Sequence, residues 1–302
     1  MESPIKLFLR MSRPLFLLGA VIVNALGVGI ADYLGVPIDW GLYLLGQAFV
    51  TTLQLSAQYL NEYFDSPADA VNPNRTPFSG GSGAVGPGKL SRNTVLLAAV
   101  TMLTIVASLT VLLINRAPAT PLLIVVLVLG FLGAFFYSVP PVRLVTSGYG
   151  ELTTSFLVAF LVPGFAFLLQ TGSFHRLLLV SALPLTALHL AMMLVFEFPD
   201  YATDLKFEKE TLLVRIGWER GMVMNNLLIL TAFLILGLAA ILSVPAGIVL
   251  PSFLLLPFGL LQIWQMRVIA AGGKPNWTLM GLTGIILFAG VAYMLAFAFW
   301  VR

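Results

Sequence analysis

The chain has 302 residues, of which 59% are hydrophobic and only 10% are charged, and its mean hydropathy is +0.98. This composition excludes an ordinary soluble protein and indicates a polytopic membrane protein. The formal net charge of +3 is small, and membrane topology explains the placement of basic residues better than nucleic-acid binding does. The absence of cysteine excludes disulfide bonds, thiolate metal sites and a cysteine nucleophile.

Nine segments are apolar enough to cross a bilayer, which requires roughly 20 residues for each helix. The first apolar run lacks a small-residue cleavage site, so we expect a retained span rather than a signal peptide. We predict an all-α membrane protein whose residues 1–302 form one domain, with loops at about 64–92 and 200–221 carrying the site. The predicted spans are 14–35, 41–63, 93–114, 119–138, 149–171, 177–199, 222–243, 246–266 and 277–301.

The positions of Lys and Arg predict the orientation of the bundle. With a cytoplasmic N-terminus, thirteen basic residues fall on the cytoplasmic side, and only Arg116, Arg176 and Arg302 fall opposite. Both long loops then face the cytoplasm, at the plasma membrane if the source is prokaryotic. The thirteen are Lys6, Arg10, Arg13, Arg75, Lys89, Arg92, Arg143, Lys206, Lys209, Arg215, Arg220, Arg267 and Lys274.

Acidic residues are concentrated in two short stretches, at the ends of the second and sixth predicted spans. The first reads Asn-Glu-Tyr-Phe-Asp-Ser-Pro-Ala-Asp from Asn61 to Asp69, and the second reads Asp-Tyr-Ala-Thr-Asp from Asp200 to Asp204. Because side chains four residues apart share one face of a helix, each stretch predicts an oxygen-lined stripe. Pro67 predicts a kink or a helix end inside the first stripe, so Asp69 belongs either to the helix or to the following loop.

The two stripes together predict a metal site. Carboxylates crowded at the edge of a low-dielectric region repel one another, and a divalent cation relieves that repulsion. Oxygen-only ligands suit a hard ion, most simply Mg²⁺, which takes one or two carboxylates and completes its shell with water and substrate phosphate. We therefore predict Asp65, Asp69, Asp200 and Asp204 as metal ligands, with a phosphate as the missing ligand.

Basic residues follow both stretches and are candidates for phosphate binding. Arg75 follows the first stretch, and Lys209 and Arg215 follow the second. The simpler explanation is that any cytoplasmic loop collects Lys and Arg. The Gly- and Ser-rich loop at 69–92 is likewise either a flexible linker or a phosphate lid that offers backbone N–H groups. It is not a Walker A loop, because no Gly-Lys-Ser/Thr follows at the required spacing.

Further polar residues lie within or beside the predicted spans. Ionisable groups at membrane depth usually face a bundle interior or a wet cavity, so Glu151 and Glu197 are predicted to line the site. Tyr137, Arg143 and Tyr201 are predicted to contact substrate from the same membrane side, as is Asn61. The remaining buried polar residues are expected to form interhelical hydrogen bonds; they are Asn24, Gln47, Gln54, Gln58 and His189.

These motifs resemble a known family over nearly the whole chain. Asn61-x₃-Asp65-x₃-Asp69, Asp200-x₃-Asp204 and the nine-span plan resemble the UbiA superfamily of intramembrane prenyltransferases. Finer features are similar to the 1,4-dihydroxy-2-naphthoate polyprenyltransferases of menaquinone synthesis. Those features are Arg13-Pro14, Pro77-Phe-Ser-Gly-Gly-Ser82, Tyr137-Ser-Val-Pro-Pro141, Gly150-Glu151 and Thr211-Leu-Leu-Val-Arg215-Ile-Gly217.

The resemblance implies a Mg²⁺-dependent reaction. A polyprenyl diphosphate would bind Mg²⁺ on the four aspartates, which act as the catalytic set, while Arg75, Lys209 and Arg215 neutralise the remaining charge. An aromatic acceptor would then attack the allylic cation. Two positions depart from the family pattern: Phe196 stands where an Asn is common, and Glu208 precedes Lys209 where a Gly is common. Both departures bear on the identity of the acceptor.

Alternative functions come from the same observations. The acceptor could be 4-hydroxybenzoate, homogentisate, a porphyrin-type ring or a glycerol-phosphate lipid. Intramembrane carboxylates also suit an ion-coupled secondary transporter, but a transporter places them near the midplane of two repeats. The Asp-Gly-x₂-Ala-Arg core of CDP-alcohol phosphotransferases is absent, and a scaffold has little reason to concentrate acidic residues. We expect no nucleic acid and no obligate protein partner.

Overall fold

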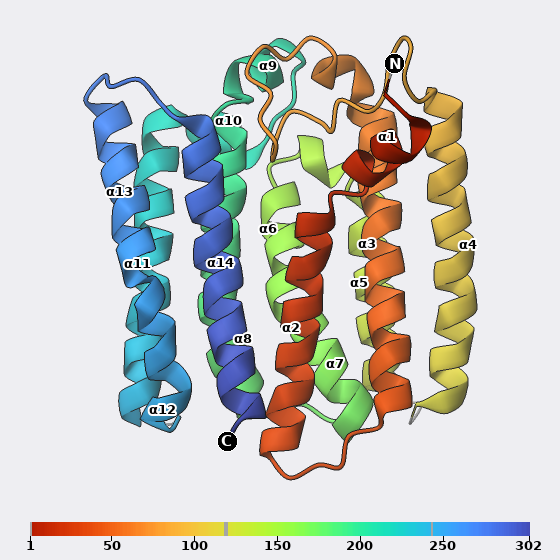
Figure 1. Cartoon of the computed structure of the whole chain (residues 1–302), viewed down its shortest axis with the longest axis vertical. Coiled ribbons are helices and arrows are strands. Elements are labelled where there is room, and N and C mark those ends of the chain that lie inside the picture. The colour runs from red at the N-terminus through yellow and green to blue at the C-terminus, as the bar shows by residue number, and fades with distance from the viewer. Residues whose placement is uncertain (1, 118–119, 243) are drawn as a thin grey trace.

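The computed structural model describes residues 2–117, 120–242 and 244–302, and these are helices and connecting loops. Long helices stand side by side and cross the full height of the molecule (Figure 1). At one end the short helices α1, α9 and α10 and the longest loop cover the bundle. Within the described ranges no strand occurs, and the only extended pairing is an isolated bridge between Val85 and Leu90. The prediction of an all-α protein is confirmed.

The helices follow the predicted segments closely. They are α1 (Pro4–Met11), α2 (Pro14–Tyr33), α3 (Trp40–Asp69), α4 (Arg92–Arg116), α5 (Pro121–Phe136), η1 (Leu144–Thr146), α6 (Gly150–Phe156), η2 (Leu157–Leu161), α7 (Val162–Thr171), α8 (Arg176–Glu197), α9 (Tyr201–Lys206), α10 (Leu212–Ile216), α11 (Trp218–Leu242), α12 (Ala246–Val249), η3 (Leu250–Leu255), α13 (Leu256–Ala270) and α14 (Trp277–Trp300).

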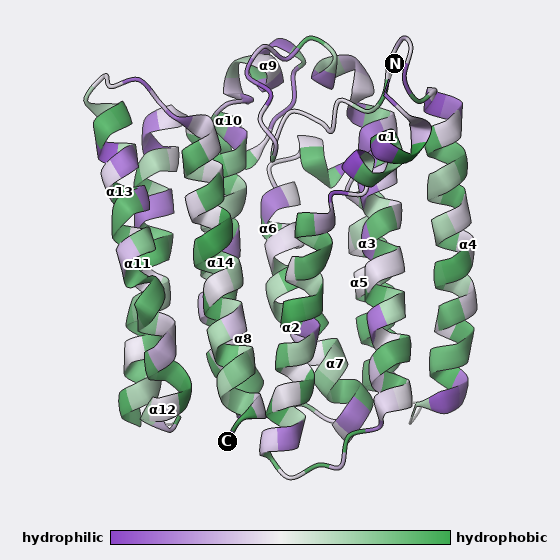
Figure 2. Ribbon diagram, in the orientation of Figure 1, coloured by the Kyte–Doolittle hydropathy of each residue, from purple (hydrophilic) through white to green (hydrophobic). Residues whose placement is uncertain are grey.

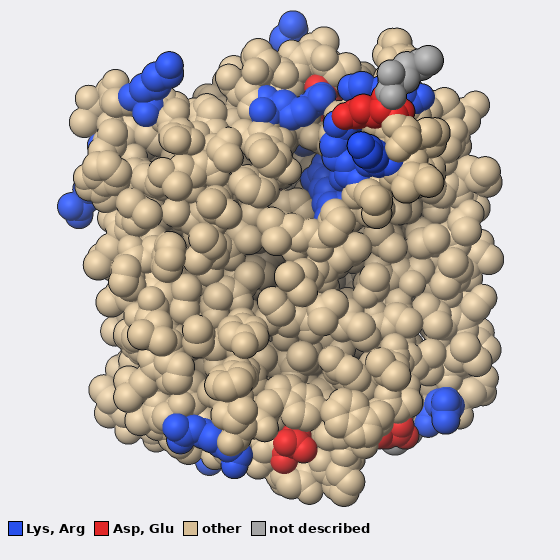
Figure 3. All heavy atoms as spheres, in the orientation of Figure 1, with Lys and Arg blue, Asp and Glu red and all other residues tan. Residues whose placement is uncertain are grey.

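In the part of the chain that the structure describes, seven helical segments are long and apolar enough to cross a membrane, and α5 is a shorter apolar helix. The helix α3 has 30 residues and carries the first acidic stretch at its end. Apolar residues cover the middle of the bundle and polar residues gather in the covering loops (Figure 2). On the face in Figure 3, Lys and Arg lie toward the two ends of the molecule. The chain is therefore a multi-pass membrane protein, while nine crossings and a cytoplasmic N-terminus stay predictions. Two predicted spans, 119–138 and 222–243, each include one residue outside the described ranges.

A close helix contact fixes the centre of the bundle. A Cβ atom on Gly27 of α2 would lie 2.1 Å from the carbonyl oxygen of Pro163, so only glycine allows α2 and α7 to approach this closely. Pro163 follows a π-helical turn, η2, which interrupts the helix that runs from Gly150 to Thr171. Such wide turns are frequent at functional sites. Here the turn presents Leu157 and Leu161 to the main cavity.

The two acidic stretches end their helices differently. α3 continues through Pro67 to Asp69, which resolves the question left open by the proline: Asp69 belongs to the helix. After α8 ends at Glu197, the chain turns and α9 begins at Tyr201, so the second stretch lies on a separate short helix. Pro199 fits this break, because proline has no backbone N–H with which to continue the hydrogen bonds of α8.

Candidate functional site

One cavity of about 340 Å³ opens below the covering loops and extends into the apolar bundle. Most of the predicted site residues line it, although they come from distant parts of the chain. The lining set includes Asn61, Asp65, Asp69, Tyr137, Glu151, Glu197, Asp200, Asp204 and Lys209. Arg75, Arg143, Tyr201 and Arg215 are not among the lining residues.

Asp65 is the most heavily paired carboxylate of the site. Its side chain is buried, and Asn61 donates to it from one helical turn earlier at 3.0 Å. Lys209 contacts its Oδ2 atom at 3.0 Å, and Arg143 contacts its Oδ1 atom at 3.3 Å. Hydrogen bonds to charged partners are the strong ones, so these contacts fix the position of the carboxylate. Arg143 thus reaches the site through Asp65.

Asp200 is held by the Gly-rich loop. Asn72 donates to its Oδ1 atom at 2.7 Å, and the Gly80 backbone and the Ser79 side chain also bond to it. Burial raises the pKa of Asp200, and these hydrogen bonds and Lys209 oppose that shift. Asn72 is not among the residues predicted from the sequence, although its position in an Asn-Pro-Asn turn is a signal that could have indicated it.

The second aspartate of each stretch has a pKa near neutrality. Burial, together with the charges of Asp65 and Glu62, raises the pKa of Asp69 to about 7. Burial also raises the pKa of Asp204 to about 7, although Lys209 opposes the shift. Both residues lie beyond the predicted spans. They are groups that need a cation close by before both can be charged at neutral pH.

Lys209 supplies a cation between the two stretches. Its ammonium group lies 3.0 Å from Asp65 and 3.9 Å from Asp204, and its side chain is only 19% exposed. Burial opposes the charge on Lys209, but the two carboxylates outweigh burial and raise its pKa. The preceding residue, Glu208, adopts a left-handed conformation with φ of 53° and is exposed. Glycine adopts this conformation without strain, and Glu208 here turns the chain so that Lys209 points inward.

The Gly-rich loop lies against both stretches and is fixed by Glu62. This buried carboxylate accepts from the Ser82 backbone at 2.7 Å and from the Ser82 hydroxyl at 2.8 Å, and it pairs with Arg13 at 2.8 Å. A Cβ on Gly81 would lie 2.2 Å from the Asp69 carboxylate. We gave Glu62 no role from sequence, although its place beside Asn61 was a signal. Its function is to hold the loop over the aspartates.

Glu151 and Glu197 line the cavity and also bind the segment that carries Lys209. Glu197 accepts from the backbone N–H of Leu213 at 2.9 Å, and Glu151 accepts from that of Leu212 at 3.3 Å. They thereby satisfy the first free N–H groups of α10 and dock this helix on the bundle. The neighbouring Phe196 packs edge-on against Phe16.

Three other predicted residues lie outside the cavity. Arg75 bonds to the backbone carbonyls of Asp69 and Gly80, so its guanidinium closes the loop on itself. Arg215 pairs with Glu210 at 2.8 Å on the surface, over the ring of Tyr149. Tyr201 packs edge-on against Trp218.

The four aspartates fit a divalent ion that completes its shell with other oxygen ligands. Among the described residues, no three acidic or histidine side chains converge closely enough to hold an ion alone. Mg²⁺ commonly binds through one or two carboxylates plus substrate phosphates, which matches this arrangement. The Lys209 ammonium already lies between Asp65 and Asp204, so a positive charge is stable at this position.

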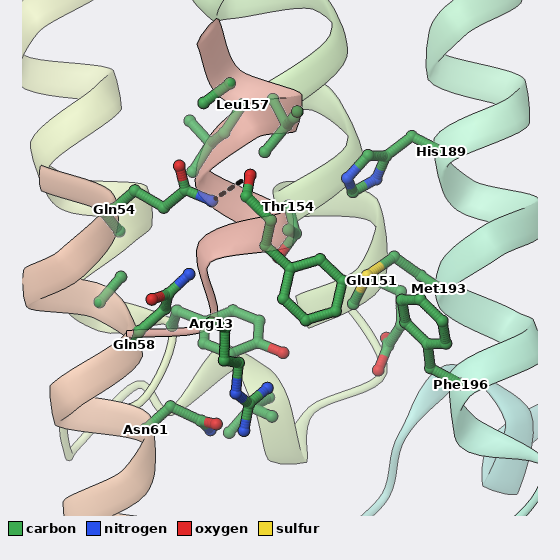
Figure 4. A pocket seen from close by; sticks show the side chains of 18 of the residues that line it. Arg13, Gln54, Gln58, Asn61, Glu151, Thr154, Leu157, His189, Met193 and Phe196 are labelled. Carbon is green, nitrogen blue, oxygen red and sulfur yellow. Dashed lines mark hydrogen bonds between the residues drawn. The ribbon is translucent and has the colours of Figure 1, made fainter. Parts of the chain in front are cut away.

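The inner part of the cavity is mostly apolar but carries several polar side chains (Figure 4). Gln54 of α3 donates to the Phe16 carbonyl of α2 at 3.1 Å, and His189 of α8 bonds to Ser155 of α6 at 3.0 Å. Both confirm the predicted interhelical hydrogen bonds. Gln47 instead bonds to Thr51 of its own helix at 2.9 Å.

Comparison with known proteins gives one family. The family model described as "UbiA prenyltransferase family" matches residues 20–276. A search among curated proteins returned no match.

Solved structures share the fold over almost the entire chain. A UbiA homolog from Archaeoglobus fulgidus bound to GPP and Mg²⁺ is 15% identical and has a TM-score of 0.66, covering 98% of this chain and 100% of that one. A digeranylgeranylglyceryl phosphate synthase is 16% identical with a TM-score of 0.63, covering 99% and 98%. A UbiA homolog from Aeropyrum pernix K1 is 13% identical with a TM-score of 0.58, covering 100% and 99%.

Proposed function

Because this chain belongs to the UbiA prenyltransferase family, we propose that it transfers a polyprenyl group from an allylic diphosphate to 1,4-dihydroxy-2-naphthoate, as in menaquinone biosynthesis, with Mg²⁺ as cofactor. One observation supports the reaction most strongly. Four aspartates and a buried lysine meet at the polar mouth of a cavity whose inner walls are apolar. The mouth suits a metal-bound diphosphate, and the interior suits an isoprenoid chain.

Asp65, Asp69, Asp200 and Asp204 are the proposed ligands of Mg²⁺. The bound ion supplies positive charge that stabilises the leaving diphosphate. Lys209 contributes a further cation at the same place, and its contacts with two of the aspartates keep it there. The Gly-rich loop covers the site and orients Asp200 through Asn72, Ser79 and Gly80.

The apolar interior protects the reaction from water. When the C1–O bond of the allylic diphosphate breaks, diphosphate leaves and an allylic cation remains, which water would capture. Phe49, Phe165 and Phe288 are among the side chains that line the interior and exclude water. The acceptor ring donates an electron pair to C1. For a dihydroxynaphthoate, the carboxylate then leaves as CO₂, and its bonding electrons restore the aromatic ring.

The remaining predicted residues receive supporting roles in this proposal. Arg143 holds Asp65, and Arg75 holds the loop, as their contacts indicate. Glu151 and Glu197 hold the segment of Lys209 while lining the acceptor side of the cavity. Tyr137 lines the same cavity. Arg215 and Tyr201 contact neither the cavity nor the aspartates in this conformation.

The arrangement disfavours ion-coupled transport, the main alternative from another class. The carboxylates gather at one end of the bundle beneath loops, whereas a transporter holds its coupling site near the midplane. The thirteen-to-three distribution of basic residues supports a cytoplasmic position for that end, where soluble substrates are delivered.

The proposal is tested with purified protein, Mg²⁺, radiolabelled geranylgeranyl or farnesyl diphosphate, and a panel of aromatic acceptors. We expect a prenylated naphthoquinol, CO₂ and diphosphate from the naphthoate, and no product with Asp65→Ala or Asp200→Ala. If product forms with 4-hydroxybenzoate, homogentisate or a glycerol phosphate instead, the proposed acceptor is wrong but prenyl transfer remains the reaction class. No diphosphate release with any acceptor, together with unchanged behaviour of both variants, would contradict prenyl transfer.

A further inference from the structure

The inner cavity contains a polar stripe that the diphosphate site does not use. Gln54, Gln58 and Asn61 follow one another on α3 at helical spacing, and all three line the cavity. Asn61 bonds to Asp65 and belongs to the diphosphate site. In Figure 4 Gln54 and Gln58 project from α3 toward the cavity, deeper in the bundle than Asn61.

The amides of this stripe have unused hydrogen-bonding capacity. The Oε1 atoms of Gln54 and Gln58 are both buried, and within the described ranges neither has a protein donor. Gln54 uses its Nε2 group on the Phe16 carbonyl, so its orientation is fixed and its oxygen faces away from that bond. A buried polar atom without a partner is destabilising. Gln47 of the same helix also has such an oxygen, but it does not line the cavity, whereas Gln54 and Gln58 do, so a polar ligand in the cavity can complete their hydrogen bonds.

The opposite wall has complementary chemistry. His189, Met193 and Phe196 project from α8 toward the same space (Figure 4). The His189 Nδ1 atom is bonded to Ser155, and the ring packs edge-on against Phe288 with centroids 4.8 Å apart, so the imidazole is held in place. Phe196 and Met193 offer a flat aromatic face and a polarizable sulfur, which favour an aromatic ring.

The depth of the stripe suits the reacting carbon. Gln58 precedes Asp65 by two helical turns on α3, which places it about 10 Å deeper at about 1.5 Å per residue. A diphosphate held by Asp65 therefore leaves its C1 atom between the aspartates and the amides. A ring bound at Gln58 lies next to that carbon.

We propose that Gln58 and Gln54, facing His189 across the cavity, form the binding subsite for the hydroxyl groups of an aromatic acceptor. A hydroxyl group of the acceptor donates to an amide oxygen and accepts from the side-chain N–H of Gln58. A purely apolar ligand forms neither hydrogen bond. This assignment rests on the proposed function and goes beyond it, because it selects hydroxylated arenes as the acceptor class.

The charges of the cavity argue against a phosphate-bearing acceptor at this depth. The cationic residues that line the described cavity are Arg13 and Lys209, and each is already paired, with Glu62 and Asp65 respectively. Gln54, Gln58 and Thr154 are uncharged. A second phosphate at this depth would bury close to two negative charges without a cationic partner, whereas a dihydroxynaphthoate carries a single carboxylate, which leaves as CO₂ in the proposed reaction.

The test compares two acceptors in two variants. The catalytic efficiency kcat/KM is measured with 1,4-dihydroxy-2-naphthoate and with 1-hydroxy-2-naphthoate, which lacks one hydroxyl group, in the wild type and in Gln58→Met. Methionine keeps the volume and the helix propensity of glutamine but cannot hydrogen-bond. We expect the wild-type preference for the dihydroxy acceptor to fall about tenfold in Gln58→Met, because one partner of a buried hydrogen bond is lost. Intrinsic ring reactivity cancels in the ratio.

Gln47→Met is the matched control, since Gln47 lies on the same helix, bonds to Thr51 and is not among the cavity residues. In Gln47→Met, the ratio of kcat/KM for the dihydroxy acceptor to kcat/KM for the monohydroxy acceptor should equal that of the wild type. An equal loss of efficiency with both acceptors in Gln58→Met would show a structural role and overturn the assignment, while leaving prenyl transfer intact. A wild type that prenylates no hydroxylated arene at all would overturn the proposed acceptor and this subsite together.

Discussion

The two aspartate stretches have the same spacing but different supports. Asp65 lies on the long helix α3 and is bonded by Asn61, Lys209 and Arg143. Asp200 precedes the short helix α9 and depends on the Gly-rich loop, through Asn72, which lies 128 residues earlier. One stretch is therefore positioned by its own helix and the other by tertiary contacts.

A second difference recurs within each stretch. The first aspartate of each pair accepts protein hydrogen bonds, which at Asp200 oppose the rise in pKa caused by burial, whereas the pKa of the second is raised to about 7. Asp65 and Asp200 are thus preorganised by the protein. Asp69 and Asp204 share protons with the solvent near neutral pH until a cation arrives. The binding of Mg²⁺ and diphosphate is expected to act chiefly on the second pair.

The largest effects should come from the first pair. Asp65→Asn removes a metal ligand and leaves Lys209 and Arg143 without their shared partner. We expect kcat/KM to fall by about 10²–10³-fold, and the thermal stability of the metal-free protein to fall as well. Asp204→Asn should lower activity similarly but leave metal-free stability unchanged, because an amide resembles the protonated acid.

Asp32→Asn is the control for both variants, because the Asp32 carboxylate is exposed near the C-terminal end of α2. Equal loss of stability in Asp65→Asn and Asp204→Asn would remove the distinction between the two aspartates.

Removal of the central cation should have the next largest effect. In Lys209→Met the charge between Asp65 and Asp204 is lost, and the KM for the prenyl diphosphate should rise about 30-fold, equivalent to about 2 kcal/mol for a charged hydrogen bond. Lys206→Met is the matched control for Lys209→Met, since it also removes one positive charge but Lys206 is exposed on α9. If both variants raise KM equally, the effect is one of overall charge rather than of position.

A pH dependence should distinguish the second pair. Since a bound ion favours the charged carboxylates, Mg²⁺ binding should strengthen as pH rises through about 7, and should be about tenfold weaker at pH 6 than at pH 8 for each proton displaced.

The effect of pH on the stability of the metal-free protein should have the opposite sign. A folded-state pKa above the unfolded value stabilises the metal-free protein at low pH, so its melting temperature should fall as pH rises from about 4 to about 7. Asp69→Asn should weaken both trends, and unchanged pH profiles in that variant would contradict the assignment.

The contact between the loop and Asp69 should give the smallest effect. Gly81→Ala adds a Cβ that would lie 2.2 Å from the Asp69 carboxylate, at a residue with φ of 76°. Gly88→Ala has a similar φ of 71° but no heavy atom within 4 Å. The difference between the variants isolates the displacement of Asp69 from backbone strain. We expect Gly81→Ala to weaken Mg²⁺-dependent activity about fivefold more than Gly88→Ala does, or about 1 kcal/mol.

Much of the fold could be predicted from hydrophobic runs, because a bilayer requires long apolar helices. The π-helical turn at Leu157–Leu161 could not, since a proline such as Pro163 inside an apolar run predicts an interruption of the helix but not its kind. In the site, carboxylate spacing indicated the four aspartates and the lysine. Asn72 and Glu62 were missed because their roles depend on how a loop folds back. Arg75 and Arg215 show the opposite case: their sequence positions beside the aspartates do not bring their charges into the cavity.

Calorimetric binding of a non-reactive prenyl thiodiphosphate tests the central claim most directly. The wild-type protein in detergent should bind the analogue tightly only when Mg²⁺ is present. Asp65→Asn and Asp204→Asn should each abolish the effect of Mg²⁺, because the two stretches share one metal-bound diphosphate. Tight binding without Mg²⁺, or an undiminished effect of Mg²⁺ in both variants, would contradict a site in which the paired aspartates hold the ion.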